Sequence, residues 1–202
     1  MTLVYDLRLW FIALYAFGLA VFLAGVFRFR PRREAIEEKH GPLPTPGALI
    51  TFLVPPIILL ARVGHYPAEW LPVRLVGVAL SLYAIVMLPW ATWTLGRMYV
   101  PGTGVFRDHK LVTAGPFRFV RHPIYSAIIT LWLGAALGTL NWLLLMTWPV
   151  YVVGVMKPAR AEEELLRAKF GEAYEEYAEE TGGFIPRLWR APAGQPEQRT
   201  QA

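Results

Sequence analysis

The 202-residue chain contains no cysteine, which excludes disulfides, thiolate metal ligands and a cysteine nucleophile. Charge is also scarce: only 17% of the residues are charged, whereas 55% are hydrophobic. A soluble domain carries about 25% charged residues, so this balance excludes an ordinary soluble domain and predicts a single membrane domain over residues 1–189. The net charge of +5 is not arranged as a basic stripe with interleaved aromatics, so we expect no nucleic-acid partner.

Long apolar runs with at most one charged residue each dominate what the chain does contain. They predict an all-α polytopic membrane protein with five transmembrane helices. The runs cover residues 9–27, 46–61, 71–95, 123–139 and 142–157. The fourth and fifth are separated by so few residues that they should form a tight hairpin. The first lacks a basic leader region and a small-residue cleavage site, so we interpret it as a retained helix.

The distribution of Lys and Arg predicts the orientation of these helices. The basic residues concentrate in 28–45, in 96–122 and after Met156, whereas the turns at 65–70 and 139–141 contain none. Because basic loops stay on the cytosolic side, the N-terminus should lie outside and the C-terminus in the cytosol. We therefore expect an integral membrane protein with this orientation.

An amphipathic helix over residues 159–180 should follow the last span on the cytosolic side. Its apolar positions recur at helical spacing along one face, and Glu162 and Glu163 lie on the two flanks of that face. These carboxylates either point into a site beneath the helix or form an acidic first turn that complements the helix dipole. Residues 190–202 have no periodicity and should be disordered.

The segment before the fourth span concentrates polar and aromatic groups. Pro123 suits the first position of a helix, which makes His122 the cap and leaves free amides that can bind an anion. Phe117 and Tyr125 would add aromatic walls that attract an onium group. The alternative is an interfacial belt of aromatic and basic side chains, which many membrane proteins carry.

Two further patterns bear on the site and on packing. The histidines have no metal-ligand spacing, so no metal site is predicted. Gly134 and Gly138 are spaced to let two helices approach closely, either within the hairpin or in a dimer. The oligomeric state is left open.

Taken in order, the motifs resemble those of the isoprenylcysteine carboxyl methyltransferase and phospholipid methyltransferase family. The resemblance covers about residues 93–186 and rests on the 109–112 run, the 115–125 core, Glu162-Glu163, Phe170-Gly171 and Ile185-Pro186. It implies methyl transfer from S-adenosylmethionine to a lipophilic small-molecule or lipid acceptor that enters from the bilayer. The cofactor would lie between the fourth and fifth helices and the cytosolic C-terminal segment. The short chain is similar to the minimal microbial members, which implies a location in a prokaryotic cytoplasmic (inner) membrane.

The resemblance also assigns roles by position. The cofactor-binding residues that it implies are His109, Lys110, Leu111, Val112, Phe117, His122, Pro123, Ile124, Tyr125 and Glu162.

Two residues are predicted to be catalytic. Arg121 is interpreted as an acceptor-side electrostatic group or as a contact for a lipid headgroup. Glu163 is a candidate for removing a proton from the acceptor, as are Tyr125 and His122. Pro158 stands where the prenylcysteine enzymes carry a substrate-associated arginine, so the acceptor class stays open among carboxylate, amine, phenol and thiol.

Two other classes of protein remain as alternatives. Membrane reductases of the sterol-reductase type share the Arg-His-Pro-x-Tyr sequence but use NADPH, whose phosphates favour basic groups over consecutive glutamates. A non-enzymatic membrane scaffold would use the same segments only for packing. Binding of a specific cofactor distinguishes the three.

Overall fold

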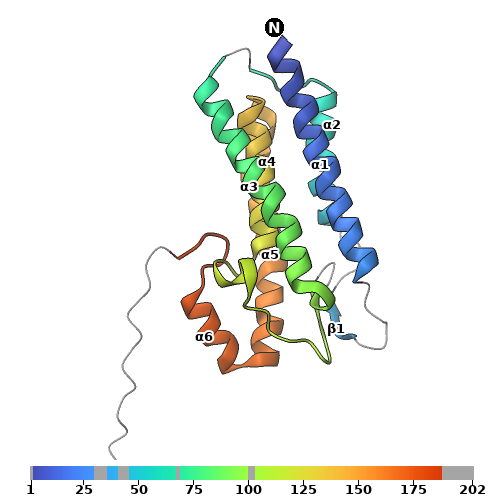
Figure 1. The fold of residues 1–202 in the computed structure, drawn as a ribbon, viewed down its shortest axis with the longest axis vertical. Coiled ribbons are helices and arrows are strands. Elements are labelled where there is room, and N and C mark those ends of the chain that lie inside the picture. Colours follow the sequence, from blue (N-terminus) through green and yellow to red (C-terminus); the bar gives the residue numbers. More distant parts are fainter. Residues whose placement is uncertain (1, 30–35, 41–45, 67–68, 100–102, 188–202) are drawn as a thin grey trace, which may run out of the picture.

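The computed structural model describes residues 2–29, 36–40, 46–66, 69–99 and 103–187. The predicted disordered tail lies outside these residues. Helices α1–α5 run side by side along the long axis, and α6 and β1 lie at the end opposite the N-terminus (Figure 1). The elements are α1 (Thr2–Arg28), β1 (Ile36–His40), α2 (Pro46–Leu60), α3 (Leu71–Leu95), η2 (Gly96–Met98), β2 (Thr103–Phe106), η3 (Gly115–Arg118), α4 (Pro123–Gly138), α5 (Trp142–Phe170) and α6 (Glu172–Glu180).

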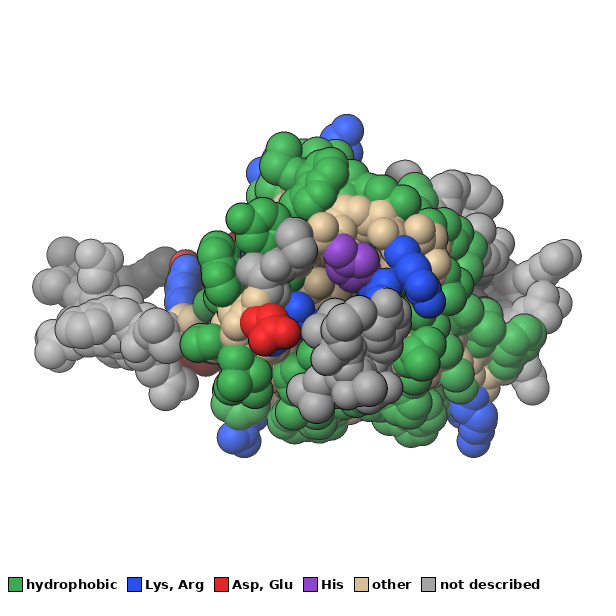
Figure 2. Space-filling model, turned by 90° about the horizontal axis from the view of Figure 1, so that it is seen from above, with side chains coloured by type: hydrophobic (Ala, Val, Ile, Leu, Met, Phe, Trp, Pro, Cys, Tyr) green, Lys and Arg blue, Asp and Glu red, His purple; other side chains and the backbone are tan. Residues whose placement is uncertain are grey.

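Three of the described helices are long and apolar enough to cross a membrane: Leu7–Arg28, Leu71–Met98 and Trp142–Phe170. The apolar parts of α2 and α4, Ile50–Leu60 and Pro123–Gly138, are shorter. Many large hydrophobic side chains on the helices face outward. The end view in Figure 2 shows hydrophobic side chains around the rim, with Lys and Arg only at scattered points. An outer surface of this kind suits hydrocarbon rather than water.

Small residues allow α3 and α4 to pack closely. A Cβ atom at Gly77 would lie 2.6 Å from the Gly134 carbonyl oxygen, closer than real Cβ contacts allow. Gly138 likewise faces the Phe11 ring of α1. The glycines expected to serve a hairpin with the fifth helix therefore serve contacts with α3 and α1 instead, because α4 presents its small-residue face to those helices.

The two turns without Lys or Arg meet at one end of the bundle. Trp142 N donates to the Gly64 carbonyl over 2.8 Å, and Tyr66 N donates to the Leu140 carbonyl over 3.0 Å. The Asn141 side chain caps α5 by accepting from Leu144 N at 3.0 Å. The connection of α4 to α5 is thus tied to the connection of α2 to α3, which holds four helix ends together.

The structure corrects the predicted break near Pro158. In place of a span ending at 157 and a separate helix over 159–180, α5 runs without interruption from Trp142 to Phe170. Proline removes one backbone donor, so the Gly154 carbonyl loses its partner in the helix, yet α5 continues through both Pro149 and Pro158. The helix ends at Gly171 instead, where φ is 54° and ψ is −126°, a conformation that suits glycine. The chain then turns into α6.

A two-stranded sheet departs from the expected all-helical fold. β1 pairs antiparallel with β2, with Ile36 opposite Phe106 and His40 opposite Thr103. Both strands come from segments predicted as loops. The pairing joins the chain after α1 to the chain after α3, and β2 also contacts α5. The sheet therefore helps to enclose the end of the bundle where α6 lies.

Candidate functional site

The described helices enclose a cavity of about 650 Å³, within the size range of small-molecule sites. It has two chemically different parts. We call the part lined by members of 98–125 and 158–177 the polar end, and the part lined by members of 50–54, 128–132 and 146–155 the apolar arm. An elongated cavity of this composition can hold an amphiphile or two ligands end to end.

All ten residues predicted to bind the cofactor line this cavity. They come from three places in the chain: the segment after β2, the η3 and α4 junction, and the second half of α5. Arg121 also lines the cavity, whereas Glu163 is not among the described lining residues. The structure therefore brings the predicted binding positions together, and of the two positions predicted to be catalytic only Arg121 is among the lining residues.

The C-terminal segment fixes the start of α4. Arg121 N and His122 N donate to the carbonyls of Gly182 and Gly183 over 2.8 and 3.0 Å. Ser126 Oγ donates to the Phe184 carbonyl over 2.5 Å. The Phe184 ring stacks on the His122 imidazole with centroids 5.2 Å apart. Residues 182–184, which we call the clasp, thus hold the start of α4 in place at the polar end.

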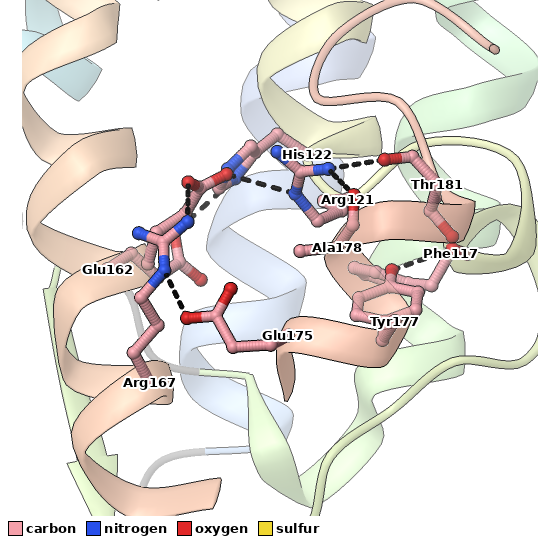
Figure 3. Close-up of polar contacts among 10 residues, drawn as sticks. Phe117, Arg121, His122, Glu162, Arg167, Glu175, Tyr177, Ala178 and Thr181 are labelled. Atoms are coloured by element: carbon pink, nitrogen blue, oxygen red, sulfur yellow. Dashed lines mark hydrogen bonds and ion pairs between the residues drawn. The ribbon is translucent and has the colours of Figure 1, made fainter. Parts of the chain in front are cut away.

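Glu163 is the centre of an ion-pair cluster, whose partners Arg121, His122 and Arg167 are labelled in Figure 3. Its Oε1 accepts from His122 Nε2 at 2.9 Å and from Arg121 Nε at 3.1 Å. Its Oε2 accepts from Arg167 at 3.3 Å, and Arg167 also donates to Glu175 at 3.0 Å. The Glu163 side chain is only 15% exposed. These contacts join α4, α5 and α6 and keep the carboxylate of Glu163 occupied.

The remaining guanidinium contacts of Arg121 are to the backbone. Its Nη1 donates to the Ala178 carbonyl over 2.9 Å and to the Thr181 carbonyl. With the Glu163 pair, these bonds hold Arg121 against the end of α6 (Figure 3). A guanidinium committed in this way positions the C-terminal segment, and it has less freedom to bind an acceptor than the sequence suggested.

Glu162 lies on the cavity side of the cluster. Its side chain is 38% exposed, and its Oε2 is 4.0 Å from His122 Nδ1. The Tyr125 side chain interacts with the same carboxylate. Two consecutive glutamates therefore do different things: Glu163 binds protein cations, and Glu162 faces the cavity and can accept hydrogen bonds from a ligand.

The helix start predicted to bind an anion is partly occupied. The amide of His122, the N-cap of α4, bonds to Gly183, and its side chain makes no cap hydrogen bond. Pro123 has no amide hydrogen, so the first-turn donors without a partner in the helix are those of Ile124 and Tyr125. Both residues line the cavity. A ligand carboxylate can therefore use two amides at this end of α4.

Two further side chains define the polar end electrostatically. Burial, with the nearby Lys169 charge, lowers the pKa of His109 to about 4, so its imidazole is neutral at pH 7. Burial raises the pKa of Tyr174 to about 12, so its hydroxyl keeps its proton. That hydroxyl is buried without a hydrogen-bond partner among the described residues. Tyr177 instead donates to the Phe117 carbonyl over 2.7 Å and supports that wall.

Sequence reasoning missed the polar groups of the apolar arm. Thr51 Oγ1 lies 2.6 Å from Tyr151 Oη, and the Tyr151 ring stacks on Trp132 with centroids 4.2 Å apart. Thr51 is a single polar residue inside an apolar run, and nothing in the local sequence indicates that it contacts Tyr151, 100 positions away. Within the described parts of the chain, no group of three His, Cys, Asp or Glu side chains could hold a metal ion.

Apolar helices of spanning length around a cavity with one polar end are features of a helical membrane protein. Comparison with known proteins specifies the family. The family model for phospholipid methyltransferases matches residues 73–173, half of the chain, and the chain belongs to this family. The matched region runs from α3 to α6 and contains every predicted site residue.

Several curated relatives are similar over the same region. A probable protein-S-isoprenylcysteine O-methyltransferase of Oryza sativa subsp. indica is 32% identical over 128 residues, which is 58% of this chain and 63% of the relative. Protein-S-isoprenylcysteine O-methyltransferase B of Arabidopsis thaliana is 27% identical over 113 residues, 54% of this chain and 57% of the relative. The cobalt-zinc-cadmium resistance protein CzcN of Cupriavidus metallidurans is 34% identical over 114 residues, 53% of this chain and 50% of the relative. The match thus spans less than two thirds of each relative.

Proposed function

We propose that the protein transfers a methyl group from S-adenosylmethionine to a lipophilic or membrane-associated acceptor of the isoprenoid carboxylate or phospholipid amine class. The observation that carries the proposal is the convergence of ten predicted cofactor positions on one cavity. Membership of the phospholipid methyltransferase family supports the same reaction.

The side chains of the polar end fit S-adenosylmethionine. The amides of Ile124 and Tyr125 would bind its carboxylate, and Glu162 would accept hydrogen bonds from its hydroxyl or amino groups. Phe117 and the tyrosines of the polar end supply aromatic faces for the adenosyl group and the sulfonium cation. The cofactor supplies an electrophilic methyl group. The chain itself supplies orientation and exclusion of water, which dominate a displacement that needs little acid-base help.

For Arg121 and Glu163 we propose positioning roles in place of the catalytic roles expected from the sequence. Glu163 binds Arg121 and His122, and Arg121 also donates to the Ala178 carbonyl, a contact that Figure 3 draws. Together they fix the clasp formed by the C-terminal segment and the orientation of His122. A general base acting on the acceptor would have to face the cavity, which Glu163 is not seen to do.

We also propose that all five apolar helices cross the membrane, with α4 and α5 as a hairpin. The N-terminus would lie outside, and α6 would lie on the cytosolic side of a prokaryotic inner membrane. The shorter apolar lengths of α2 and α4 require local thinning of the bilayer or burial of their ends in the protein. The cavity would then open its polar end toward the cytosol and its apolar arm toward the hydrocarbon.

Calorimetric titration of the detergent-purified protein with S-adenosylhomocysteine, run in parallel with NADPH, tests the proposal. Saturable binding of S-adenosylhomocysteine alone supports it. Glu162→Ala and His122→Ala should each weaken this binding at least tenfold, whereas the exposed neighbour Glu164→Ala should bind normally. Binding of NADPH alone would assign the protein to the reductase class. A folded protein that binds neither would favour the scaffold.

A further inference from the structure

The apolar arm contains few polar side chains and, among its described lining residues, no charged one. The polar members are Thr51, Trp132, Thr147 and Tyr151. Thr147 Oγ1 donates to the Leu143 carbonyl at 2.9 Å, and Trp132 Nε1 donates to the Leu144 carbonyl at 3.2 Å. Their hydrogens therefore remain within the helices and are not offered to a ligand.

The Thr51 and Tyr151 hydroxyls can be assigned as donor and acceptor. Thr51 Oγ1 donates its single hydrogen to the Gly47 carbonyl, 2.7 Å away. It therefore has to accept at its 2.6 Å contact with Tyr151 Oη, and Tyr151 has to donate. The phenol hydrogen of Tyr151 is thereby used, and its oxygen keeps a lone pair for the cavity. Stacking of its ring on Trp132 holds this lone pair in place.

The side chains of the arm thus offer ligands hydrogen-bond acceptors and no free donor. A carboxylate consists only of acceptors and carries a charge, so burying it here would leave it unpaired at a cost of several kcal/mol. An N–H, O–H or S–H group can instead donate to Tyr151 Oη. Along α5, Gly154, Val155 and Pro158 line the path from Tyr151 toward Glu162, and none supplies a cation.

We propose that the arm selects a lipophilic acceptor whose nucleophilic atom bears a hydrogen, an amine, hydroxyl or thiol, and that Tyr151 Oη positions this group. The inference rests on the proposed function and narrows its acceptor class away from carboxylates. In the transfer, the acceptor lone pair forms the bond to the methyl carbon, and the bond between carbon and sulfonium sulfur breaks with its electrons going to sulfur. The hydrogen on the acceptor atom leaves as a proton to water at the polar end.

A panel of acceptors with one matched tail tests this selection. The full-length protein in detergent is given S-adenosylmethionine with a radiolabelled methyl group and dodecylamine, dodecanol, dodecanethiol or dodecanoate. Phosphatidylethanolamine and N-acetyl-S-farnesylcysteine provide a lipid amine and a prenylated carboxylate. We expect methylation of at least one N–H, O–H or S–H acceptor and at least tenfold slower methylation of both carboxylates. A carboxylate methylated as fast as the best of the others overturns the inference.

Two variants test the role of Tyr151. Tyr151→Phe keeps the ring and removes the acceptor oxygen, so kcat/KM for the preferred acceptor should fall about tenfold while S-adenosylhomocysteine affinity stays unchanged. Thr51→Val removes the acceptor of the Tyr151 hydrogen, which can then bind a carboxylate. The ratio of the methylation rates of the preferred acceptor and dodecanoate should therefore fall severalfold. If the hydrogen bond between Thr51 and Tyr151 were only structural, that ratio would not change. Tyr83→Phe, at a half-exposed site on α3 outside the cavity, is the matched control.

The results separate this inference from the proposed function. If the protein binds S-adenosylhomocysteine but methylates none of the hydrogen-bearing acceptors, the inference is refuted and the proposed function is not. The same holds if Tyr151→Phe and Thr51→Val both leave the acceptor preference unchanged. A folded protein that does not bind S-adenosylhomocysteine refutes the proposed function, and the acceptor assignment with it.

Discussion

Replacing Glu163 by glutamine tests whether this residue positions the site or takes part in the chemistry. The change preserves the shape of the side chain and one acceptor oxygen but removes the charge. In the native protein that charge compensates Arg121 at 3.1 Å and binds His122 Nε2 at 2.9 Å, and the Glu163 and Arg121 side chains are each only 15% exposed. The variant would leave the guanidinium largely buried without a counter-ion.

These contacts set bounds on the free energy of unfolding that the variant would lose. Breaking a buried ion pair by removing one partner costs about 3–5 kcal/mol. The glutamine oxygen can still accept one hydrogen bond, and two backbone carbonyls still bind Arg121, so we expect about 2–3 kcal/mol. The contact to Arg167, which is 41% exposed, adds less than about 1 kcal/mol. By the usual scaling for chains of this length, the thermal midpoint should fall by about 4–12 °C.

The assay is thermal unfolding in detergent followed by tryptophan fluorescence, with methyl transfer measured at a temperature where the variant is folded. Glu164→Gln on the same helix turn is exposed and should move the midpoint by no more than about 1 °C. A positioning role predicts a lower midpoint with residual activity, which rises when the cofactor is raised to saturation. If the Glu163→Gln protein unfolds at the midpoint of the control and has no activity, this reasoning is refuted, and Glu163 would again be the candidate general base.

Two other predictions concern the polar end. Because the pKa of His109 is about 4 in the folded protein and near 6.5 when unfolded, the unfolded chain binds more protons between these values. His109 therefore contributes stability that is complete above pH 6.5 and lost as the pH falls through 4; thermal midpoints between pH 7 and 4 should decline less steeply in His109→Gln. Tyr177→Phe removes the 2.7 Å hydrogen bond to the Phe117 carbonyl and should weaken S-adenosylhomocysteine binding about fivefold by calorimetry. An equal loss in Tyr66→Phe, at the exposed turn after α2, would contradict the specific role of Tyr177.

The sequence predicted those features of the fold whose signals are local. The apolar run at 71–95 became α3 with the same bounds, and Pro123 begins α4 as its missing amide hydrogen suggested. The convergence of the 109–112 segment with Glu162 could not be predicted from local patterns, because the two lie on separate elements. It came from the resemblance to a family, which carries long-range information that a single helix period does not.

The errors of sequence reasoning have physical causes. The β1 and β2 strands are short and do not alternate apolar and polar residues, so their pairing depends on the neighbouring helices rather than on their own pattern. Glu162 and Glu163 are adjacent carboxylates with identical local chemistry. Their difference in role depends on which face of α5 meets Arg121 and which meets the cavity. Donor assignments such as that of Thr51 require coordinates, because a hydroxyl can donate only once.

The continuity of α5 through Pro158 has a consequence for specificity. A break there would have put Tyr151 and Glu162 on separately placed elements. On one helix they are about three turns apart, roughly 16 Å along the axis, and three whole turns return a residue to the same face. Val155 and Pro158 lie between them on that face and also line the cavity. The distance between the group that would hold the acceptor and the group that would hold the cofactor is therefore set by helix geometry, so a change in acceptor class requires substitutions along this face of α5 rather than movement of the clasp.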